Sequence, residues 1–115
     1  WYADRTQVLH NSIWRPEVNW SRGIRVGNGT TRTEIVNNLV HGEIRLEGGA
    51  ARLSHNLAER LEGYFVEPEA GNLELTPEAI RAAGQGKPLS EVTEDIRGRP
   101  RSNHPDLGAW ESHVE

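Results

Sequence analysis

The stretch AARLSHNLAERLEGY, residues 50–64, decides what the rest of the chain is expected to build. Its apolar residues recur every three or four positions, which places them on one face of an α-helix. That face comprises Ala50, Leu53, Leu57, Leu61 and Tyr64. The opposite face comprises Arg52, His55, Glu59 and Glu62. The stretch is therefore predicted to form an amphipathic helix that packs on a core.

Short segments on either side of this helix have the pattern of β-strands. The strings YFVE and LEL flank the turn-rich PEAGN, so residues 64–75 are predicted to form a β-hairpin. Apolar residues alternate in GIRV, residues 23–26, and in EIRL, residues 43–46, which indicates two more short strands. Together these strands are expected to form a small antiparallel sheet.

Start and stop signals predict further helices. Thr31 and Glu34 form a capping box ahead of an apolar stripe. Thr76 and Pro77 have the form of a helix start, and Gly84 would end that helix. Other candidate helices are residues 1–14, residues 89–96 and a final segment that begins at Pro105. The predicted fold class is α+β, with four or five short helices packed on a small antiparallel sheet or hairpin, and no internal repeat is identified.

The predicted helix and hairpin resemble the wing region of MarR-type winged-helix regulators. The resemblance rests on LAERLEGYFVEPEAGNLELTPEAIRAA, residues 57–83, with its Leu-Glu-Gly helix end and its Leu-Thr-Pro-Glu after the second strand. It implies a recognition helix in the DNA major groove, with Arg52, Ser54, His55, Asn56 and Arg60 as the contacting positions. The wing tip carries Glu67 and Glu69 where a basic tip is usual, and the alternative is an ordinary helix packed on a hairpin.

Composition sets broad limits on the chain. Its 115 residues carry a net charge of −4 and contain neither Cys nor Met, so disulfides and thiolate metal sites are excluded. We expect a single small domain over residues 1–115 that is part of a longer polypeptide or has been excised from one. No signal peptide and no apolar run of about 18 residues is visible, so a soluble protein without a membrane partner is expected.

The charge is unevenly distributed along the chain. Residues 1–60 hold 8 basic and 6 acidic residues, whereas residues 61–115 hold 5 basic and 11 acidic residues. Broad phosphate binding needs many cations, so any contact with nucleic acid is expected to be local. The acidic segment 61–95 is a candidate surface for a basic protein partner.

The segment RGRPRSNH, residues 97–104, is the most basic part of the second half. Its Arg-Gly-Arg-Pro matches the core of the AT-hook, a motif that lies in the minor groove of A·T-rich DNA and here implies contacts from Arg97, Arg99 and Arg101. Glu94 and Asp95 come directly before it. The favoured alternative is a connector loop whose arginines are neutralised by the acidic segment.

Histidines offer a catalytic alternative. Ribonucleases that use no metal rely on histidine as acid or base beside a cation, so His55, Glu59 and His104 are the candidate catalytic residues of a nuclease. The pairs His41/Glu43 and His55/Glu59 each supply two metal ligands, whereas zinc usually needs three or four. No metal and no cofactor is therefore expected.

Three functions remain open. The first is a nucleic-acid-interacting domain that uses Arg52, His55, Asn56, Arg60, Arg97, Arg99 and Arg101. The second is a histidine-dependent nuclease or toxin-type effector domain of a larger polypeptide. The third is a protein–protein interaction module with an acidic face. Of the three hypotheses, the nucleic-acid-interacting domain is narrowly preferred.

Overall fold

The chain folds almost entirely into strands and irregular loops. The computed structural model describes residues 6–14, 22–27, 32–46 and 50–111. The strands are β1 (Gln7–Leu9), β2 (Ser12–Ile13), β3 (Arg22–Val26), β4 (Thr33–Val36), β5 (Leu39–His41), β6 (Glu43–Leu46), β7 (Ala51–Ser54), β8 (Leu57–Glu59), β9 (Phe65–Glu67) and β10 (Asn72–Leu75). The one helical element of the described ranges is the 3-10 turn η1 (Pro68–Ala70), so no described helix is long enough to cross a membrane.

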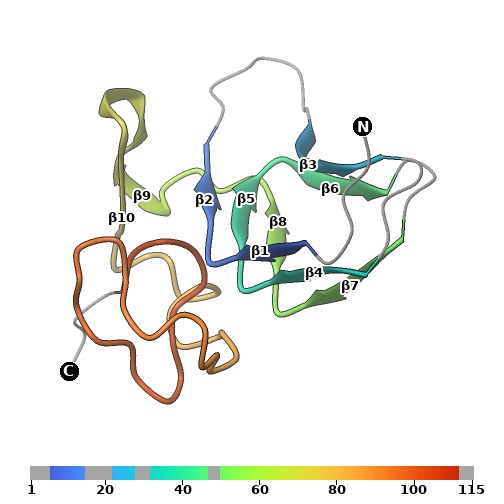
Figure 1. Cartoon of the computed structure of the whole chain (residues 1–115). Helices are drawn as coiled ribbons and strands as arrows, with labels where there is room; N and C mark the ends of the chain where they lie inside the picture. Colours follow the sequence, from blue (N-terminus) through green and yellow to red (C-terminus); the bar gives the residue numbers. More distant parts are fainter. Residues whose placement is uncertain (1–5, 15–21, 28–31, 47–49, 112–115) are drawn as a thin grey trace.

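The first eight strands wind into a parallel β-solenoid. Successive coils pair in parallel and in the orders β1-β4-β7, β2-β5-β8 and β3-β6 (Figure 1). We call β1–β3 the first coil, β4–β6 the second coil and β7–β8 the third coil. The third coil contributes to two of the three sheets and not to the sheet of β3 and β6. In such a stack each coil packs on its neighbours and buries a continuous core.

A short two-residue turn joins the first two strands of every coil. Its first residue has a left-handed backbone: φ is 53° at His10, 61° at Asn37 and 56° at His55. Asparagine and histidine adopt this conformation more readily than most residues. Its second residue is always asparagine, and we call the stack of Asn11, Asn38 and Asn56 the asparagine ladder.

The asparagine ladder joins the coils through hydrogen bonds. The Asn38 side-chain amide donates to the Val8 carbonyl of the first coil at 2.8 Å, and its Oδ1 accepts from the Asn11 backbone N–H at 2.9 Å. One coil further on, Asn56 donates to the Ile35 carbonyl at 2.7 Å and accepts from the Asn38 backbone N–H at 3.0 Å. The same two bonds thus recur at both steps and fix how the coils align.

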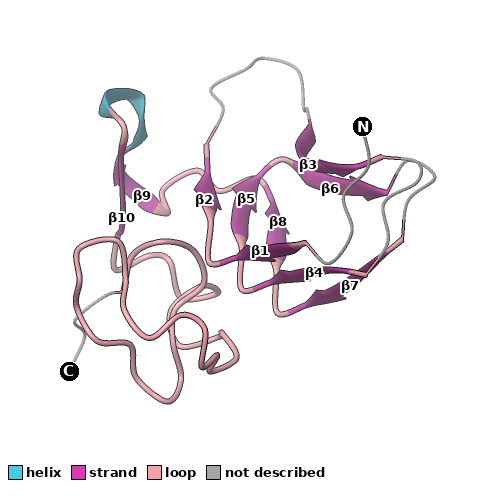
Figure 2. Cartoon of the chain, in the orientation of Figure 1, coloured by secondary structure: helices cyan, strands magenta, loops and turns pink. Residues whose placement is uncertain are grey.

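Residues 76–111, which we call the C-terminal lobe, cover one outer face of the solenoid. They form turns and loops and contain no strand of more than an isolated bridge (Figure 2). Leu39 of β5 faces this lobe and belongs to one core cluster with Leu61, Phe65, Leu75, Ala79, Ala82 and Leu107. Because neighbouring side chains of a strand point to opposite faces, Val40 lies inside the coil, where it is fully buried.

The lobe is tied closely to the solenoid turn. The Gly108 N–H donates to the Asn37 carbonyl at 2.8 Å, and the Ala109 N–H donates to Ser12 Oγ at 2.8 Å. Gly108 has φ of +86°, and a Cβ there would lie 2.3 Å from Ser12 Oγ. Only glycine fits this close contact without displacing the Ser12 hydroxyl, which accepts the Ala109 N–H.

The α+β prediction with four or five helices was wrong. Residues 50–64 form β7, the turn, β8 and a connection to β9 instead of a helix. Two strands joined by a two-residue turn place Leu53 and Leu57 four positions apart, which imitates a helical period. The winged-helix interpretation is wrong for the same reason, because residues 51–59 contain β7 and β8, two paired strands of the solenoid.

Other expectations had mixed outcomes. The hairpin of residues 64–75 is confirmed by the antiparallel pair β9–β10, and the strands at GIRV and EIRL are confirmed as β3 and β6, although they pair in parallel. The helix after Thr76 is replaced by turns in which Ala79 and Ala82 are buried and Ile80 is exposed. Segments 6–14, 32–41, 89–96 and 105–111 are also not helical. Residues 1–5, Thr31 and the chain after residue 111 lie outside the described residues.

Candidate functional site

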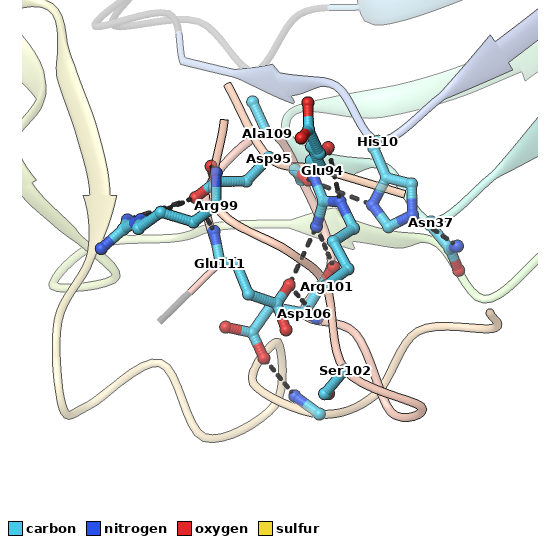
Figure 3. Close-up of polar contacts among 12 residues, drawn as sticks. His10, Asn37, Glu94, Asp95, Arg99, Arg101, Ser102, Asp106, Ala109 and Glu111 are labelled. Carbon is cyan, nitrogen blue, oxygen red and sulfur yellow. Dashed lines mark hydrogen bonds and ion pairs between the residues drawn. The ribbon is translucent and has the colours of Figure 1, made fainter. Parts of the chain in front are cut away.

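The arginines of RGRPRSNH fold back onto carboxylates within the C-terminal lobe. The Asp95 side chain is fully buried and accepts backbone N–H bonds from Arg97 and Arg99, each at 2.9 Å, while the Arg99 guanidinium lies 3.2 Å from its second oxygen (Figure 3). Burial raises the pKa of Asp95, but the backbone donors, including Glu111 N–H, and the Arg99 charge outweigh it, so the pKa is lowered. Asp95 therefore stays ionised and fixes the loop.

Arg101 is the most deeply buried of these arginines. Its side chain is 4% exposed and lies 3.0 Å from Glu111, whose side chain is 6% exposed. It also donates to the backbone carbonyls of Glu94, Asp106 and Gly108 (Figure 3). Burial raises the pKa of Glu111, which the nearby N–H donors and the Arg101 charge only partly offset. This ion pair ties the arginine loop to the last described residue of the lobe.

The third arginine of the loop is placed differently. The Arg97 guanidinium lies over the ring of Trp110, 5.7 Å from its centroid, and the side chain is otherwise exposed. The expected pairing of the loop arginines with the acidic segment is thus confirmed at Arg99, which pairs with Asp95, whereas Arg101 is neutralised by Glu111. Glu111, however, lies outside the acidic segment that was expected to supply the carboxylates.

His10 and Asn37 join the ladder turn to the lobe. Burial, together with the Arg101 charge, lowers the pKa of His10 to about 4. The ring is therefore neutral near pH 7, with Nδ1 3.2 Å from the Gly108 carbonyl and Nε2 3.0 Å from the Asn37 amide. Asn37 also bonds the backbone of Lys87 on both sides, at 2.6 and 2.8 Å. Both residues serve the packing of the lobe.

The three catalytic candidates are not joined by a described contact. His55 is exposed at the turn of the third coil, with Nδ1 2.5 Å from Ser54 Oγ. Glu59 pairs with Arg81 at 2.6 Å. His104 lies in the lobe, where its backbone N–H donates to Ser102 Oγ. No hydrogen bond or ion pair within the described part of the chain links these three side chains.

The nucleic-acid candidates fall into two groups. Arg52, His55, Asn56 and Arg60 lie in or directly after the third coil, and the three loop arginines lie in the lobe. Arg52 is exposed on β7, in register with Glu34 of β4. The amide of Asn56 is already engaged in the asparagine ladder. Across the described ranges, no group of three or more His, Asp or Glu side chains is arranged to hold a metal ion.

The sequence interpretation missed the end of the solenoid formed by the third coil. Leu53 and Ala58 continue the inward positions of Ile35 and Val40, yet Leu53 is 43% exposed and Ala58 is also exposed. Leu46 of the second coil, whose register position has no third-coil strand, is 44% exposed. We call this surface the open end. It holds a concave region of about 470 Å³ lined by Glu43, Ile44, Leu53, Ser54, His55, Asn56 and Ala58.

Two backbone groups at the open end are left unpaired among the described residues. The Asn56 N–H and the Leu53 carbonyl correspond to the groups that the ladder fills at both earlier steps. Within the described residues neither group has a hydrogen-bond partner. The signal for this end was present in the sequence as LHN, VNN and SHN, but these repeats are 27 and 18 residues apart and differ at most positions.

No family model, curated protein or solved structure matches this chain.

Proposed function

We propose that this chain is a protein-interaction module that binds a partner polypeptide at the open end by β-strand addition. The observation that carries the proposal is the exposure of Leu53 together with the unfilled Asn56 N–H and Leu53 carbonyl. An unpaired sheet edge is a ready template for another chain, and main-chain hydrogen bonds give such binding its affinity.

The apolar floor strengthens this proposal. Leu53 is in register with Ile35, which is fully buried, and Leu46 is in register with Val26, which is also buried. Burying exposed apolar surface stabilises a complex by about 25 cal/mol for each Å² removed from water. The open end therefore presents an added strand with the same two kinds of contact, backbone hydrogen bonds and apolar packing, that the second coil makes with the third.

The other two functions have less support in the geometry. A nucleic-acid interface would draw on Arg99 and Arg101, whose guanidinium groups are held by Asp95 and Glu111. A histidine nuclease would need His55 and His104 in one pocket, whereas the pocket at His55 is lined by third-coil and β6 residues. Strand addition at the open end requires no rearrangement of the described structure.

The experiment is a titration of the ¹⁵N-labelled chain with a capped peptide of residues 6–14, TQVLHNSIW, which is the strand–turn–strand of the first coil. We expect amide shifts confined to β6, β7, β8 and their turns, saturating with peptide concentration. Leu53→Lys should abolish these shifts, because it places a charge in the apolar floor. Ile80→Lys is the matched control, because Ile80 is 73% exposed in the C-terminal lobe.

Two results would contradict the proposal. One is the absence of any saturable shift at the third coil. The other is an equal response to a peptide of the same composition in scrambled order. Salt-dependent binding of DNA or RNA by the same chain, lost on Arg52→Ala, would instead favour the nucleic-acid function.

A further inference from the structure

We infer that the open end selects a partner segment with an asparagine at its turn. This inference rests on the proposed function and specifies the chemistry of its partner. The occupant is a strand–turn–strand of a separate polypeptide, with an aliphatic residue three positions before the asparagine and another two positions after it.

The requirement for asparagine follows from the two ladder steps within the chain. Each asparagine reaches back to the coil before it, where Nδ2 donates to a strand carbonyl and Oδ1 accepts the backbone N–H of the preceding asparagine. The distances are 2.8 and 2.9 Å at Asn38 and 2.7 and 3.0 Å at Asn56. The repeat shows that one side chain fills both positions.

The open end presents the next pair of the same groups. A partner asparagine would donate to the Leu53 carbonyl and accept from the Asn56 N–H. An aspartate has the acceptor without the donor, an alanine has neither, and a neutral amide supplies both on one short side chain. The open end therefore distinguishes asparagine from aspartate and alanine, which backbone pairing alone would not do.

The aliphatic positions follow from the stacks inside the coils. Val8, Ile35 and Leu53 occupy the position three residues before each ladder asparagine and are in register. Ile13, Val40 and Ala58 occupy the position two residues after it. Because Ala58 is small and borders the concave region, a large aliphatic residue of the partner fits over it.

The residue directly before the partner asparagine is restricted as well. This position is His10, Asn37 or His55 in the three coils, and φ is positive in each. Histidine, asparagine or glycine is therefore expected there in a partner. The peptide of residues 6–14 meets every requirement, with Val8, His10, Asn11 and Ile13 in place.

The test compares peptides and leaves the protein unchanged, so loss of folding cannot produce the result. Titrations of the ¹⁵N-labelled chain use the 6–14 peptide and its Asn11→Ala, Asn11→Asp and Gln7→Ala forms. Asn11→Ala removes both hydrogen bonds, and Asn11→Asp removes the donor and places a carboxylate against the Leu53 carbonyl. Each form should therefore bind about tenfold or more weakly. The Gln7→Ala form should bind unchanged, because that side chain faces away from the coil interior.

The outcomes separate this inference from the proposed function. Equal affinities of the asparagine and alanine peptides would overturn the selection and leave strand addition standing. Binding of none of the peptides would overturn both. Self-association of the chain that Leu53→Lys abolishes, seen by sedimentation without peptide, would assign the open end to a second copy and overturn the separate partner.

Discussion

Asn38→Asp should destabilise the chain far more than the same change at Asn56. Asn38 is fully buried, and its amide donates to the Val8 carbonyl at 2.8 Å and to Asn56 Oδ1 at 3.0 Å. Aspartate keeps the shape but replaces this donor with an oxygen that faces two acceptors. The position is then without a donor, and a buried charge is added unless the carboxyl is protonated.

The magnitude can be worked from these contacts. Two net hydrogen bonds contribute about 0.5–1.5 kcal/mol each, and a buried acceptor left unsatisfied costs about 1–3 kcal/mol more. The free energy of unfolding should fall by about 3–5 kcal/mol, a large part of the total of about 5–15 kcal/mol of a typical domain. Asn56→Asp loses one amide bond at a half-buried site, so its cost should be about 1–2 kcal/mol.

Urea unfolding followed by tryptophan fluorescence measures both costs, because Trp14 packs against the core. A matched slope of free energy against urea concentration would show that both variants unfold from the same fold. A cost at Asn38 that is below about 1 kcal/mol, or no larger than the cost at Asn56, would refute the reasoning that the asparagine ladder holds the coils together.

Three further predictions test the contacts between the solenoid and the C-terminal lobe. The wild-type chain should lose about 3 kcal/mol of stability between pH 6.5 and 4, because the unfolded histidine binds a proton before the folded one with its pKa of about 4. His10→Asn should not show this loss. Equal loss of stability with falling pH in both chains, measured by urea unfolding, would contradict the assignment. Arg101→Met should lower the free energy of unfolding by about 3–5 kcal/mol, because it leaves Glu111 buried without its cation. Arg97→Ala should lower it by less than about 1 kcal/mol. Similar thermal midpoints for both variants would contradict the structural role given to Arg101. Gly108→Ala should cost at least about 2 kcal/mol, since φ is +86° and a hydroxyl oxygen of β2 would lie 2.3 Å from the new Cβ; an unchanged melting temperature would show that the lobe does not press on the solenoid.

Short-range features of the fold could be predicted from the sequence. The hairpin of β9 and β10 depends on a local turn, and the alternation in β3 and β6 is visible within four residues. Adjacent acidic residues likewise indicated that the arginine loop is neutralised, and Asp95 does hold Arg99. Each of these signals lies within a few positions of the residues that it describes.

The solenoid could not be read in the same way because its defining contacts are between coils. Ile35 and Leu53 pair across 18 residues and Val8 and Ile35 across 27, so the repeat has no fixed period. Leu53 and Leu57 also satisfy a helical period and lie on strands that face different parts of the core. The deciding signal was the asparagine shared by three turns, which predicts ladder bonds only once the coils are aligned.

The functional interpretation from sequence failed for a related reason. Arg101 was considered for DNA contact because arginines are common in DNA-binding segments. Its burial depends on Glu111, which lies 10 residues further along the chain. The exposure of Leu53 and the lack of a described partner for the Asn56 N–H cannot be seen in any local pattern. Both follow from the fact that no described strand pairs with the outer edge of the third coil.

Hydrogen–deuterium exchange at the Asn56 amide tests the central claim most directly. In the chain alone, the Asn38 N–H should exchange slowly because it donates to Asn56 Oδ1, whereas the Asn56 N–H should exchange rapidly. Saturation with the 6–14 peptide should slow exchange at Asn56 to the range of Asn38, and the Asn11→Ala peptide should not. Protection of the Asn56 amide without peptide, or no change on its addition, would contradict the account of the open end.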